Sequence, residues 1–415
     1  MDFFENKEQP ERAVLVSLDT GEFDAESSVA EMSELARTAG AEVFGEVIQK
    51  KDKPDPATFL GSGKLDELKQ LCDDNDIDLL IFDSELSPSQ QRNIEKLTDV
   101  RVVDRTTLIL DIFAARALSG EGKLQVELAQ LKYSLPRLGG KGVELSRLGG
   151  GIGTRGPGES KLESDKRHIR RRINALEQDL NELEQRRKRY RERRKKDGVT
   201  TVALVGYTNA GKSTLMNTLT DAGVLAENKL FATLDPTARA LTLPDGRSVM
   251  LIDTVGFIRR LPHKLVEAFK STLAEAADAD LILNICDASD DECAEQLAVT
   301  LDLLKELECE GKPVISVMNK CDLAQDLFSI PVIGDTVKIS ALNGTGTDKL
   351  LETIVRMLPP TRKRVRLLLP FSMGSDAARL RADSAVHSEE YTPDGLLLDV
   401  TADIHELERL KDYIQ

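Results

Sequence analysis

The sequence predicts an α/β protein made of several units, and three observations lead to that prediction. Over residues 13–117, apolar strand-like runs alternate with helical patterns, the order that produces a parallel sheet covered by helices. At Gly206–Ser213, a glycine-rich loop separates a buried-strand pattern from a helical one. Between these two regions, leucines and isoleucines recur at steps of three and four residues, as on the packed face of a helix.

The composition argues against several classes of protein. No apolar run approaches the ~18 residues that a membrane-spanning helix needs, and polar Met1–Arg12 lacks the apolar stretch of a signal peptide. The five cysteines show no metal-ligand spacing and are expected to be thiols in a reducing compartment. We therefore expect a cytoplasmic protein without a membrane partner, and a monomer when it is free.

The formal net charge of −15 is unevenly distributed. Residues 1–117 carry a net −13, residues 118–198 carry +9, and residues 199–415 carry −11. A basic segment between two acidic ones is a candidate surface for a polyanion such as RNA. The predicted units are an N-terminal α/β domain (1–117), a basic arm (118–198), a nucleotide domain (199–358) and a small C-terminal α/β module (359–415).

In the N-terminal unit, a short Gly-Ser-Gly-Lys sequence ends at Lys64 and precedes a helical pattern. Gly61–Lys64 is a candidate anion site at a helix N-terminus, and an ordinary loop is an equally good interpretation. The expected strands are 13–18, 42–48, 78–82 and 100–103, and the expected helices are 27–39, 65–72, 87–97 and 107–118.

The arm is predicted to be an antiparallel helical hairpin. One apolar stripe runs from Leu124 to Leu135 and a longer one from Ile169 to Leu183, with a loop of nine glycines between them at 138–161. Nine of the eleven residues in Arg186–Lys196 are Arg or Lys. A flexible linker and a solvated charged helix are the alternatives, but the position of both segments favours contact with RNA phosphates. The predicted RNA contacts are Arg147, Arg155, Lys161, Arg186, Arg187 and Arg189.

The loop Gly206–Ser213 matches the pattern Gly-x-x-x-x-Gly-Lys-Ser of a P-loop. Backbone N–H groups and a helix N-terminus converge there on one anion site. Lys212 is expected to reach the β- and γ-phosphates of a nucleotide, and the Ser213 hydroxyl to bind Mg²⁺.

Further motifs follow the P-loop in a fixed order. Phe231–Thr237 has the position of a switch loop in which Thr233 completes the Mg²⁺ shell, with Thr237 as the alternative. Asp253-Thr-Val-Gly256 is predicted to hold Mg²⁺ through water at Asp253 and the γ-phosphate at the Gly256 N–H. The side chain of Asp322, in an Asn-Lys-x-Asp element, can accept hydrogen bonds from the edge that guanine has and adenine lacks.

These elements together predict a P-loop GTPase domain whose substrate is GTP and whose cofactor is Mg²⁺. Lys212, Thr233 and Gly256 are the expected catalytic residues, and the metal is expected at Ser213, Thr233 and, through water, Asp253. The expected GTP-binding residues are Gly206, Tyr207, Thr208, Asn209, Ala210, Gly211, Lys212, Ser213, Thr214, Phe231, Ala232, Thr233, Leu234, Asp235, Asp253, Thr254, Val255, Gly256, Asn319, Lys320, Asp322, Ser340, Ala341 and Leu342.

Phe257 follows the Asp-x-x-Gly element, where many small GTPases have a glutamine that orients the attacking water. Phenylalanine cannot hydrogen-bond to water, so slow intrinsic hydrolysis completed by a partner or another group is expected. Arg259 and Arg260 are candidates for assistance but are expected to be surface residues. In the C-terminal module, 364–369 and 396–400 are predicted strands, and 376–386 and 404–414 predicted helices, with no catalytic cluster.

The chain resembles the HflX family of translation-associated GTPases, in the wider class that includes Obg, over nearly its whole length. The most specific matches are Gly156–Asp165, Gly206–Leu215 and Phe231–Thr237, and Phe257 fits the subclass with a hydrophobic residue in place of glutamine. Ser160 stands where many relatives are expected to have threonine. The resemblance implies GTP-dependent binding to the large (50S) ribosomal subunit and its rRNA through the arm, in splitting or rescue of ribosomes, and hydrolysis stimulated by the ribosome.

Two other functions are compatible with the residues. One is a GTP-gated switch for a protein partner, and the other an RNA-remodelling enzyme with a second nucleotide site at Gly61–Lys64.

Overall fold

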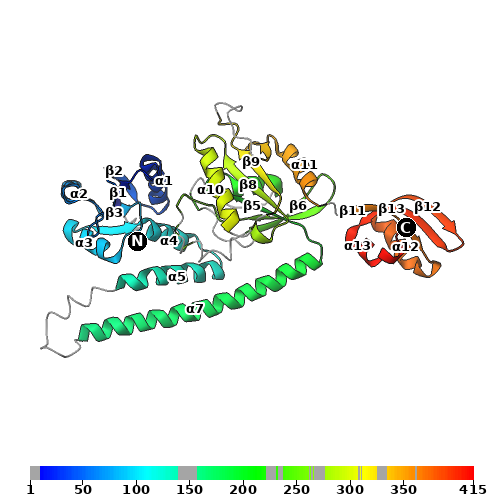
Figure 1. The fold of residues 1–415 in the computed structure, drawn as a ribbon, viewed down its shortest axis with the longest axis horizontal. Coiled ribbons are helices and arrows are strands. Elements are labelled where there is room, and N and C mark those ends of the chain that lie inside the picture. Colours follow the sequence, from blue (N-terminus) through cyan, green and yellow to red (C-terminus); the bar gives the residue numbers. More distant parts are fainter. Residues whose placement is uncertain are drawn as a thin grey trace, which may run out of the picture.

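The computed structural model describes residues 10–138, 157–220, 230–231, 237–260, 262, 265, 276–306, 309, 311–324, 334–359 and 362–415. The N-terminal domain, the nucleotide domain and the C-terminal module follow one another along the long axis, and the arm lies along the first two (Figure 1). None of the described helices is long and apolar enough to span a bilayer.

The N-terminal domain is built on a four-stranded sheet of order β2-β1-β3-β4 in which every pairing is parallel, as predicted. Alternate residues of β1 enter opposite cores, Ala13 and Leu15 on one face and Val14 and Val16 on the other, so both faces need helices. The strands are β1 (Arg12–Asp19), β2 (Glu42–Lys50), β3 (Leu79–Phe82) and β4 (Arg101–Asp104). The helices are α1 (Ala25–Thr38), α2 (Ser62–Asn75), α3 (Pro88–Thr98) and α4 (Arg105–Arg116).

The arm consists of α5 (Gly120–Ser134), a short 3₁₀ turn η1 (Leu135–Leu138), and the 40-residue helix α7 (Pro157–Lys196). The two helices lie side by side, and α7 extends well beyond α5 to reach the nucleotide domain (Figure 1). The predicted apolar stripes meet: buried Leu128, Ile173 and Leu176 form the centre of the contact. Around it pack Leu124, Leu131, Leu135, Ile169 and Leu180.

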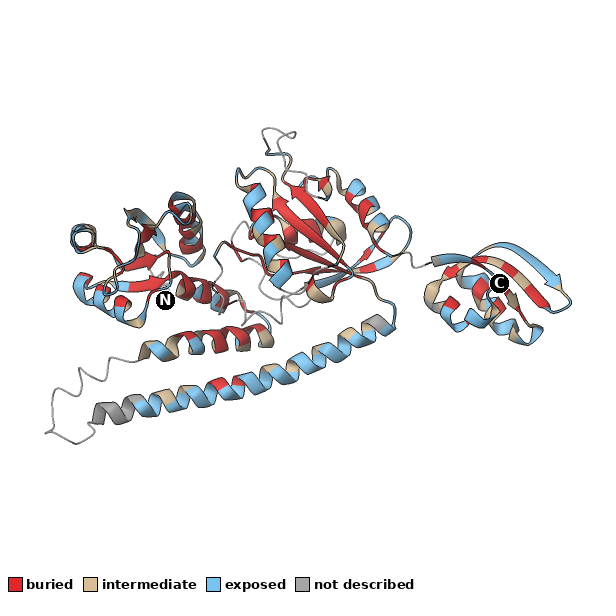
Figure 2. Cartoon of the chain, viewed as in Figure 1, coloured by how far each residue is buried: buried red, intermediate tan, exposed pale blue. Residues whose placement is uncertain are grey.

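The nucleotide domain contains a six-stranded sheet of order β10-β9-β8-β5-β7-β6, parallel except for the antiparallel pair β6–β7. Its two central strands, β5 and β8, are buried except at Asp287, the last residue of β8 (Figure 2). The strands are β5 (Thr201–Gly206), β6 (Thr237–Thr242), β7 (Ser248–Asp253), β8 (Leu281–Asp287), β9 (Val314–Asn319) and β10 (Asp335–Lys338). Its helices include α8 (Lys212–Thr220), α10 (Cys293–Glu306) and α11 (Thr347–Met357).

The C-terminal module differs from the predicted alternation of strand and helix. Its helix α12 (Gly374–Asp383) ends before Val386, which the sequence placed inside a helix and which lies in strand β12 (Ala385–Thr392). Strands β11 (Arg362–Leu369) and β12 pair with β13 (Gly395–Asp403) in an antiparallel sheet, followed by α13 (Ile404–Arg409). Most residues of β12 are exposed, so the strand lacks the apolar alternation that would have identified it.

Candidate guanine-nucleotide site

The P-loop leaves the buried strand β5 at Gly206 and enters α8 at Lys212, as the sequence predicts. Gly211 has a backbone φ of +94°, and a Cβ atom there would lie 2.2 Å from Nδ2 of Asn319. A Cβ atom on Gly206, φ +147°, would lie 2.1 Å from the carbonyl oxygen of Ile285. Only glycine fits at these two positions, because the loop passes directly against the ends of β8 and β9.

Lys212 is 6% exposed, and its ammonium group lies inside the loop. Nζ donates hydrogen bonds to the carbonyl oxygens of Gly206 at 3.1 Å and Tyr207 at 2.8 Å. Burial lowers the pKa of Lys212 to about 8, although the nearby Asp253 carboxylate favours the charged form. The lysine is therefore held within the phosphate-binding loop, with a positive charge that depends on pH near neutrality.

A pair of oxygen donors lies beside this lysine. The Ser213 hydroxyl donates to Oδ2 of Asp253 at 2.8 Å, and Asp253 is fully buried at the end of β7. A hydroxyl and a carboxylate are hard oxygen ligands of the kind that Mg²⁺ prefers. Ser213 and Asp253 are two of the three residues that the sequence analysis assigned to the metal, and Thr233 is the third.

The Asp-x-x-Gly segment pairs with the P-loop through its backbone. The Thr208 N–H donates to the Phe257 carbonyl at 2.7 Å, and the Phe257 N–H donates to the Gly206 carbonyl at 3.1 Å. Gly256 lies so close that a Cβ atom on it would come within 2.9 Å of Nζ of Lys212. The side chain of Phe257 is buried in a separate apolar cluster with Ala203 and Val205, so it supports the sheet.

Asn319, at the end of β9, braces the predicted guanine end of the site. Its Nδ2 donates to the carbonyl oxygen of Ala210 at 2.8 Å, and its Oδ1 accepts from the Ala341 N–H at 2.8 Å. Asn319 therefore ties the P-loop to the Ser340–Leu342 loop.

At the same end of the site, Lys320 is paired with a carboxylate, whereas Asp322 and Leu342 are exposed. Lys320 forms an ion pair of 2.6 Å with Asp287 at the end of β8. The Asp322 side chain is exposed, and so is 81% of Leu342. Asp287 was not predicted from the sequence. The usable signal was an aspartate directly at the end of a predicted buried strand, 281–286.

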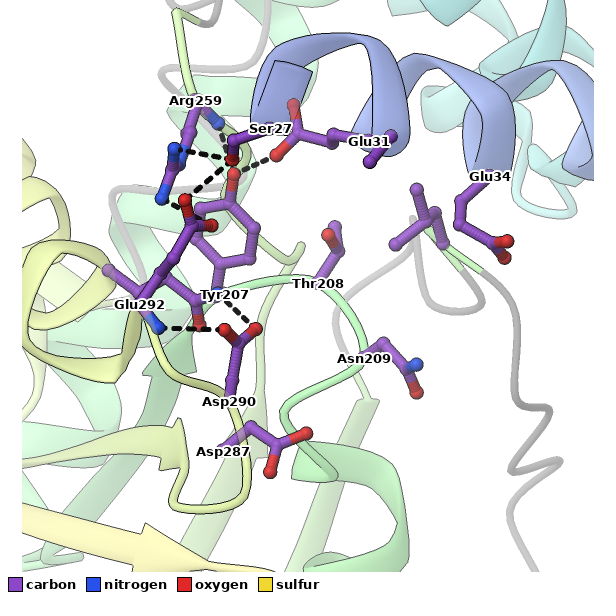
Figure 3. Close-up of a pocket in the computed structure, with 13 residues that line it drawn as sticks. Ser27, Glu31, Glu34, Tyr207, Thr208, Asn209, Arg259, Asp287, Asp290 and Glu292 are labelled. Carbon is purple, nitrogen blue, oxygen red and sulfur yellow. Dashed lines mark hydrogen bonds and ion pairs between the residues drawn. The ribbon is translucent and has the colours of Figure 1, made fainter. Parts of the chain in front are cut away.

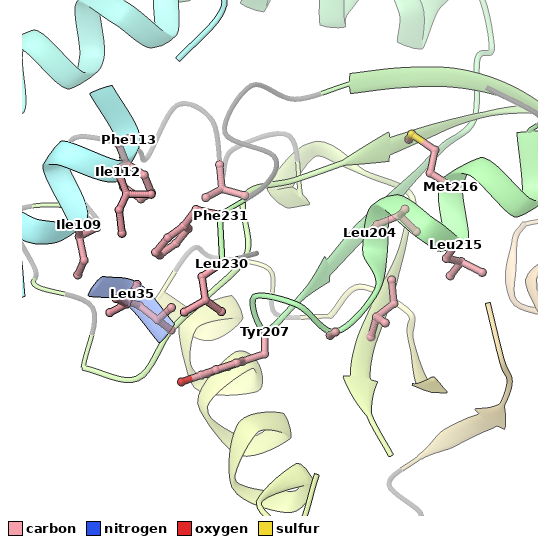
Figure 4. Close-up of a cluster of buried hydrophobic side chains, with 14 of the residues drawn as sticks. Leu35, Ile109, Ile112, Phe113, Leu204, Tyr207, Leu215, Met216, Leu230 and Phe231 are labelled. Atoms are coloured by element: carbon pink, nitrogen blue, oxygen red, sulfur yellow. The ribbon is translucent and has the colours of Figure 1, made fainter. Parts of the chain in front are cut away.

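The switch loop is described only at its two ends, Phe231 and Thr237, and Thr237 is the first residue of β6. Ala232, Thr233, Leu234 and Asp235 lie outside the described residues. Phe231 was predicted to bind GTP, but its side chain is 2% exposed and stacks edge to face on Phe113 of α4, with ring centroids 4.6 Å apart. Figure 4 shows Phe231 pointing toward Ile112 and Phe113 of α4 in the N-terminal domain. The start of the switch loop is thus packed against the other domain.

The P-loop also contacts the N-terminal domain. The Tyr207 hydroxyl donates to Oε2 of Glu31 on α1 and accepts the Arg259 N–H at 2.6 Å. Burial and the Glu31 carboxylate raise the pKa of Tyr207, which keeps the phenol protonated. The side chain predicted to bind GTP therefore points to the neighbouring domain and leaves its backbone in the loop (Figure 3).

Arg259 and Arg260 lie in this contact, which corrects the expectation that they are simple surface residues. Arg259 pairs with Glu292 of the nucleotide domain at 2.6 Å and donates to the Ser27 hydroxyl of α1 at 3.0 Å. Arg260 pairs with Asp83 at the end of β3 at 2.5 Å. Both side chains are partly buried because they fill the interface between the domains.

Behind Arg260 lies a buried network of charges. Asp83, 1% exposed, also pairs with Arg105 at 2.7 Å, and Arg105 in turn pairs with Glu31 and donates to the Arg259 carbonyl at 2.9 Å. Asp83 directly follows β3 and Arg105 directly follows β4. Both therefore stand at the carboxyl edge of the sheet, where open α/β sheets usually bind their ligands. Here the carboxyl edge receives an arginine from the nucleotide domain.

The basic run of α7 has two faces. Arg187 was predicted to contact RNA, but it pairs with Glu121 of α5 at 3.0 Å. Arg191 pairs with Asp278, and Arg194 donates to the Met250 sulfur at 3.2 Å, both in the nucleotide domain. The steps of four and three residues place these arginines on one side of the helix.

Among the side chains of this run that the structure describes, five cations are exposed. They include Arg186 and Arg189, which were both predicted to contact RNA. The five are Arg186, Lys188, Arg189, Arg193 and Lys196, named here the outer cations. Arg147 and Arg155 lie outside the described residues, and so does the side chain of Lys161.

The candidate anion site in the N-terminal domain is engaged by its own chain. The Gly61 N–H donates to Oε1 of Gln49 at 2.9 Å, and Nζ of Lys64 pairs with Glu67 at 2.9 Å. Gly61 is the N-cap of α2 and has no side chain to accept from the helix. The segment therefore begins α2 and joins this helix to β2 through the hydrogen bond between Gly61 and Gln49.

Comparisons with known proteins identify the family of the chain. Residues 26–114, 116–194 and 201–320 match families described as GTP-binding GTPase N-terminal, GTP-binding GTPase middle region and 50S ribosome-binding GTPase. The GTPase HflX of Caldanaerobacter subterraneus subsp. tengcongensis is 51% identical over 97% of this chain and 94% of its own length. The chain belongs to the HflX family of GTPases.

Other HflX proteins are similar over the same extent. The GTPase HflX of Escherichia coli K12 is 41% identical over 94% of this chain and 93% of its own length. Among solved structures, a GTP-binding protein of Sulfolobus solfataricus in complex with GDP is 29% identical, with a TM-score of 0.44 over 84% of this chain and 98% of that one.

In this HflX GTPase, the sequence identified the loops of the site and missed the residues that connect it to the N-terminal domain. Glu31, Asp83 and Arg105 are single charged residues in separate elements. The one available signal was Arg105, because an arginine directly after a buried strand is unusual and needs a partner.

Proposed function

We propose that this HflX GTPase hydrolyses GTP with Mg²⁺ held at Ser213 and, through water, at Asp253. The Ser213 hydroxyl and the buried Asp253 carboxylate, 2.8 Å apart, support this site. The ion would neutralise charge on the phosphates of the nucleotide. Thr233, which lies outside the described residues, is proposed as a further ligand on the basis of its place in the motif Phe231–Thr237.

The proposed catalytic groups act through position and charge. Lys212 would move from the carbonyls of Gly206 and Tyr207 to the β- and γ-phosphates, and the N–H of Gly256, which lies near Nζ of Lys212, would donate to the γ-phosphate. Asp322 would accept from the guanine base, with Asn319 holding the two loops around it. The remaining P-loop residues would contribute backbone N–H groups.

We propose that intrinsic hydrolysis is slow. Phe257, which occupies the usual glutamine position, is 1% exposed and packs in an apolar cluster. Neither its chemistry nor its position lets it orient a water molecule. The activating group is expected to come from the partner or from another segment.

We further propose that the partner is the large ribosomal subunit, contacted at its rRNA by the outer cations and by the glycine-rich loop. The observation that carries this proposal is that the basic residues of α7 fall on two faces of the helix. Arg187, Arg191 and Arg194 fix the helix to α5 and the nucleotide domain, which leaves the outer cations exposed on a rigid support. Phosphate contacts position a protein on RNA without base reading. A role in splitting or rescue of ribosomes would follow from entry of the arm into the subunit.

The first experiment measures GTP hydrolysis by the purified protein with and without large subunits, at low and physiological salt. We expect a large stimulation, within the ~10³–10⁵-fold range of an activating group, and GTP-dependent binding. Hydrolysis without stimulation or binding would refute the ribosomal partner and favour the GTP-gated switch for a protein. The contacts of Gly61 and Lys64 give no support to a second nucleotide site.

A further inference from the structure

Two buried cysteines face each other beside the guanine end of the site. Cys286 is the last residue but one of strand β8, and Cys293 is the first residue of α10. Their Sγ atoms lie 2.8 Å apart, and both residues are less than 5% exposed. A disulfide bond is about 2.05 Å long, so the two sulfur atoms need to approach each other by less than about 1 Å to form one.

The loop between the two cysteines connects the guanine end of the site with the interface to the N-terminal domain. Next to Cys286, Asp287 pairs with Lys320 at 2.6 Å, and the Ala288 N–H donates to the Asn319 carbonyl at 2.8 Å. Next to Cys293, Glu292 accepts from the Ser27 hydroxyl at 2.6 Å and pairs with Arg259. A change in the geometry of the cysteines therefore acts on residues that hold the guanine loop and the neighbouring domain.

The loop lies at the surface even though the sulfur atoms do not. Ser289 and Asp291 are exposed, and the other residues of 287–292 are partly exposed. Asp287, Asp290 and Glu292 also line a cavity of about 270 Å³ between α1, the P-loop and α10 (Figure 3). A small displacement of this loop would let an oxidant as small as a peroxide reach the thiols.

We propose that Cys286 and Cys293 are a peroxide-sensitive dithiol, and that their oxidation to a disulfide weakens the binding of guanine nucleotides. The oxidant is hydrogen peroxide or another peroxide of low mass.

The chemistry balances with one peroxide per pair. The Cys293 sulfur, as the thiolate, attacks one peroxide oxygen; the O–O bond breaks, and hydroxide leaves and takes up the thiol proton as water. The Cys286 sulfur then attacks the resulting sulfenic sulfur; the S–O bond breaks, and the second hydroxide leaves with the Cys286 proton as water. Two thiols are oxidised, one peroxide is reduced, and two waters form.

The environment favours Cys293 as the first nucleophile. The hydrogen bond from the Cys286 thiol lowers the pKa of Cys293, and the N–H groups of the first turn of α10 also favour a thiolate. The same hydrogen bond, together with burial, raises the pKa of Cys286. Cys286 then suits the role of the resolving thiol, which reacts after Cys293 is oxidised.

The test uses the full-length protein, peroxide, and alkylation followed by mass spectrometry. No lysine or arginine separates Cys286 from Cys293, so both lie on one tryptic peptide. We expect this peptide to lose two hydrogen atoms, to resist alkylation after oxidation, and to recover on treatment with dithiothreitol. Cys293→Ala and Cys286→Ala should each prevent the change. Cys309→Ala, which removes another buried thiol, should allow it.

The consequence is measured as the dissociation constant for GDP before and after oxidation, with and without reduction. We expect a rise of several-fold in the oxidised protein, reversed by dithiothreitol and missing in Cys293→Ala. Both thiols remaining open to alkylation, or a bridge from Cys293 to Cys321, would overturn the assignment of the pair. A bridge that leaves the dissociation constant unchanged would overturn its link to nucleotide binding. Neither readout depends on ribosomes or on hydrolysis.

Discussion

The Tyr207 hydroxyl of the P-loop donates a hydrogen bond to Glu31 of the N-terminal domain, across 176 residues of sequence. The same oxygen accepts from the Arg259 N–H, which follows the Asp-x-x-Gly element. One phenol thus joins the P-loop, the segment after the Asp-x-x-Gly element and the neighbouring domain. Together with the stacking of Phe231 on Phe113, this places parts of three predicted nucleotide-binding segments against one domain.

Replacing Tyr207 with phenylalanine tests this connection. Loss of a hydrogen bond to a charged group costs about 1.5–3 kcal/mol, so we expect a P-loop held less firmly and faster dissociation of GDP. Stopped-flow release of a fluorescent GDP analogue measures the rate. Tyr190→Phe, which alters a 68% exposed tyrosine on α7, is the matched control. An unchanged release rate in Tyr207→Phe would show that the contact does not hold the loop.

The buried carboxylate of Asp83 is expected to stabilise the interface between the domains. Asp83→Asn leaves Arg105 with one fewer charged partner and removes the ion pair with Arg260. Breaking a buried pair in this way costs about 3–5 kcal/mol. Urea denaturation of the single variants and of the double variant with Arg260→Ala gives the coupling energy. A coupling energy near zero would contradict a direct interaction between Asp83 and Arg260.

The affinity for nucleotide should depend on the ionisation of Lys212. Its pKa in the folded protein is about 8, so above this pH the free protein loses the positive charge that phosphates need, and affinity should fall. Isothermal titration calorimetry with GDP from pH 7 to about 9.5 measures the profile. Lys212→Arg, which stays charged, should lack this decline. The same decline in Lys212→Arg would assign it to another group.

The stability of the fold should change with pH in the opposite sense to the affinity: a rising pH that lowers the affinity for nucleotide should raise the free energy of unfolding contributed by Lys212. Its pKa is depressed from the ordinary value of 10.5, so the unfolded chain binds more protons between about pH 8 and 10.5. The contribution of Lys212 to stability is therefore fully present above that range and is lost as the pH falls through about 8.

Base specificity is expected to depend on Asp322. Asp322→Asn replaces an acceptor with a group that can also donate, so binding of GTP should weaken and xanthine nucleotides should gain. Removing a charged hydrogen bond of about 1.5–3 kcal/mol corresponds to roughly a ten- to hundredfold loss of affinity. Competition binding with GTP and XTP measures it, with Asp302→Asn as an exposed control. GTP binding equal to that of the unaltered protein would refute the role of Asp322.

The outer cations should account for the salt dependence of binding to ribosomal RNA. Each phosphate contact adds about 0.7–0.9 to the slope of log K against log salt, so neutralising Arg186, Arg189 and Arg193 should lower it by roughly 2–3. Filter binding to isolated large subunits at several salt concentrations gives the slope. The control neutralises three arginines elsewhere that are more than half exposed: Arg37, Arg101 and Arg356. Equal slopes for both triple variants would exclude the helix as the contact.

The sequence by itself determined the parts that depend on consecutive residues. A P-loop is a strand, a glycine turn and a helix in one continuous segment, so Gly206–Ser213 could be read directly, and the period of two or of 3.6 residues identified most of the helices and strands. Strand β12 was missed because it lies on an edge with mostly exposed side chains, and exposure removes the apolar alternation.

Tertiary structure alone decided which groups meet across the domains. Nothing near Glu31 or Asp83 in sequence indicates a partner in the nucleotide domain, because Tyr207 and Arg260 lie more than 170 residues away. The faces of α7 were decided in the same way: the spacing of Arg187, Arg191 and Arg194 indicates one side of a helix, but only the fold shows which side Glu121 and Asp278 occupy. Local sequence limits backbone conformation, whereas pairs of charges depend on how the finished domains pack.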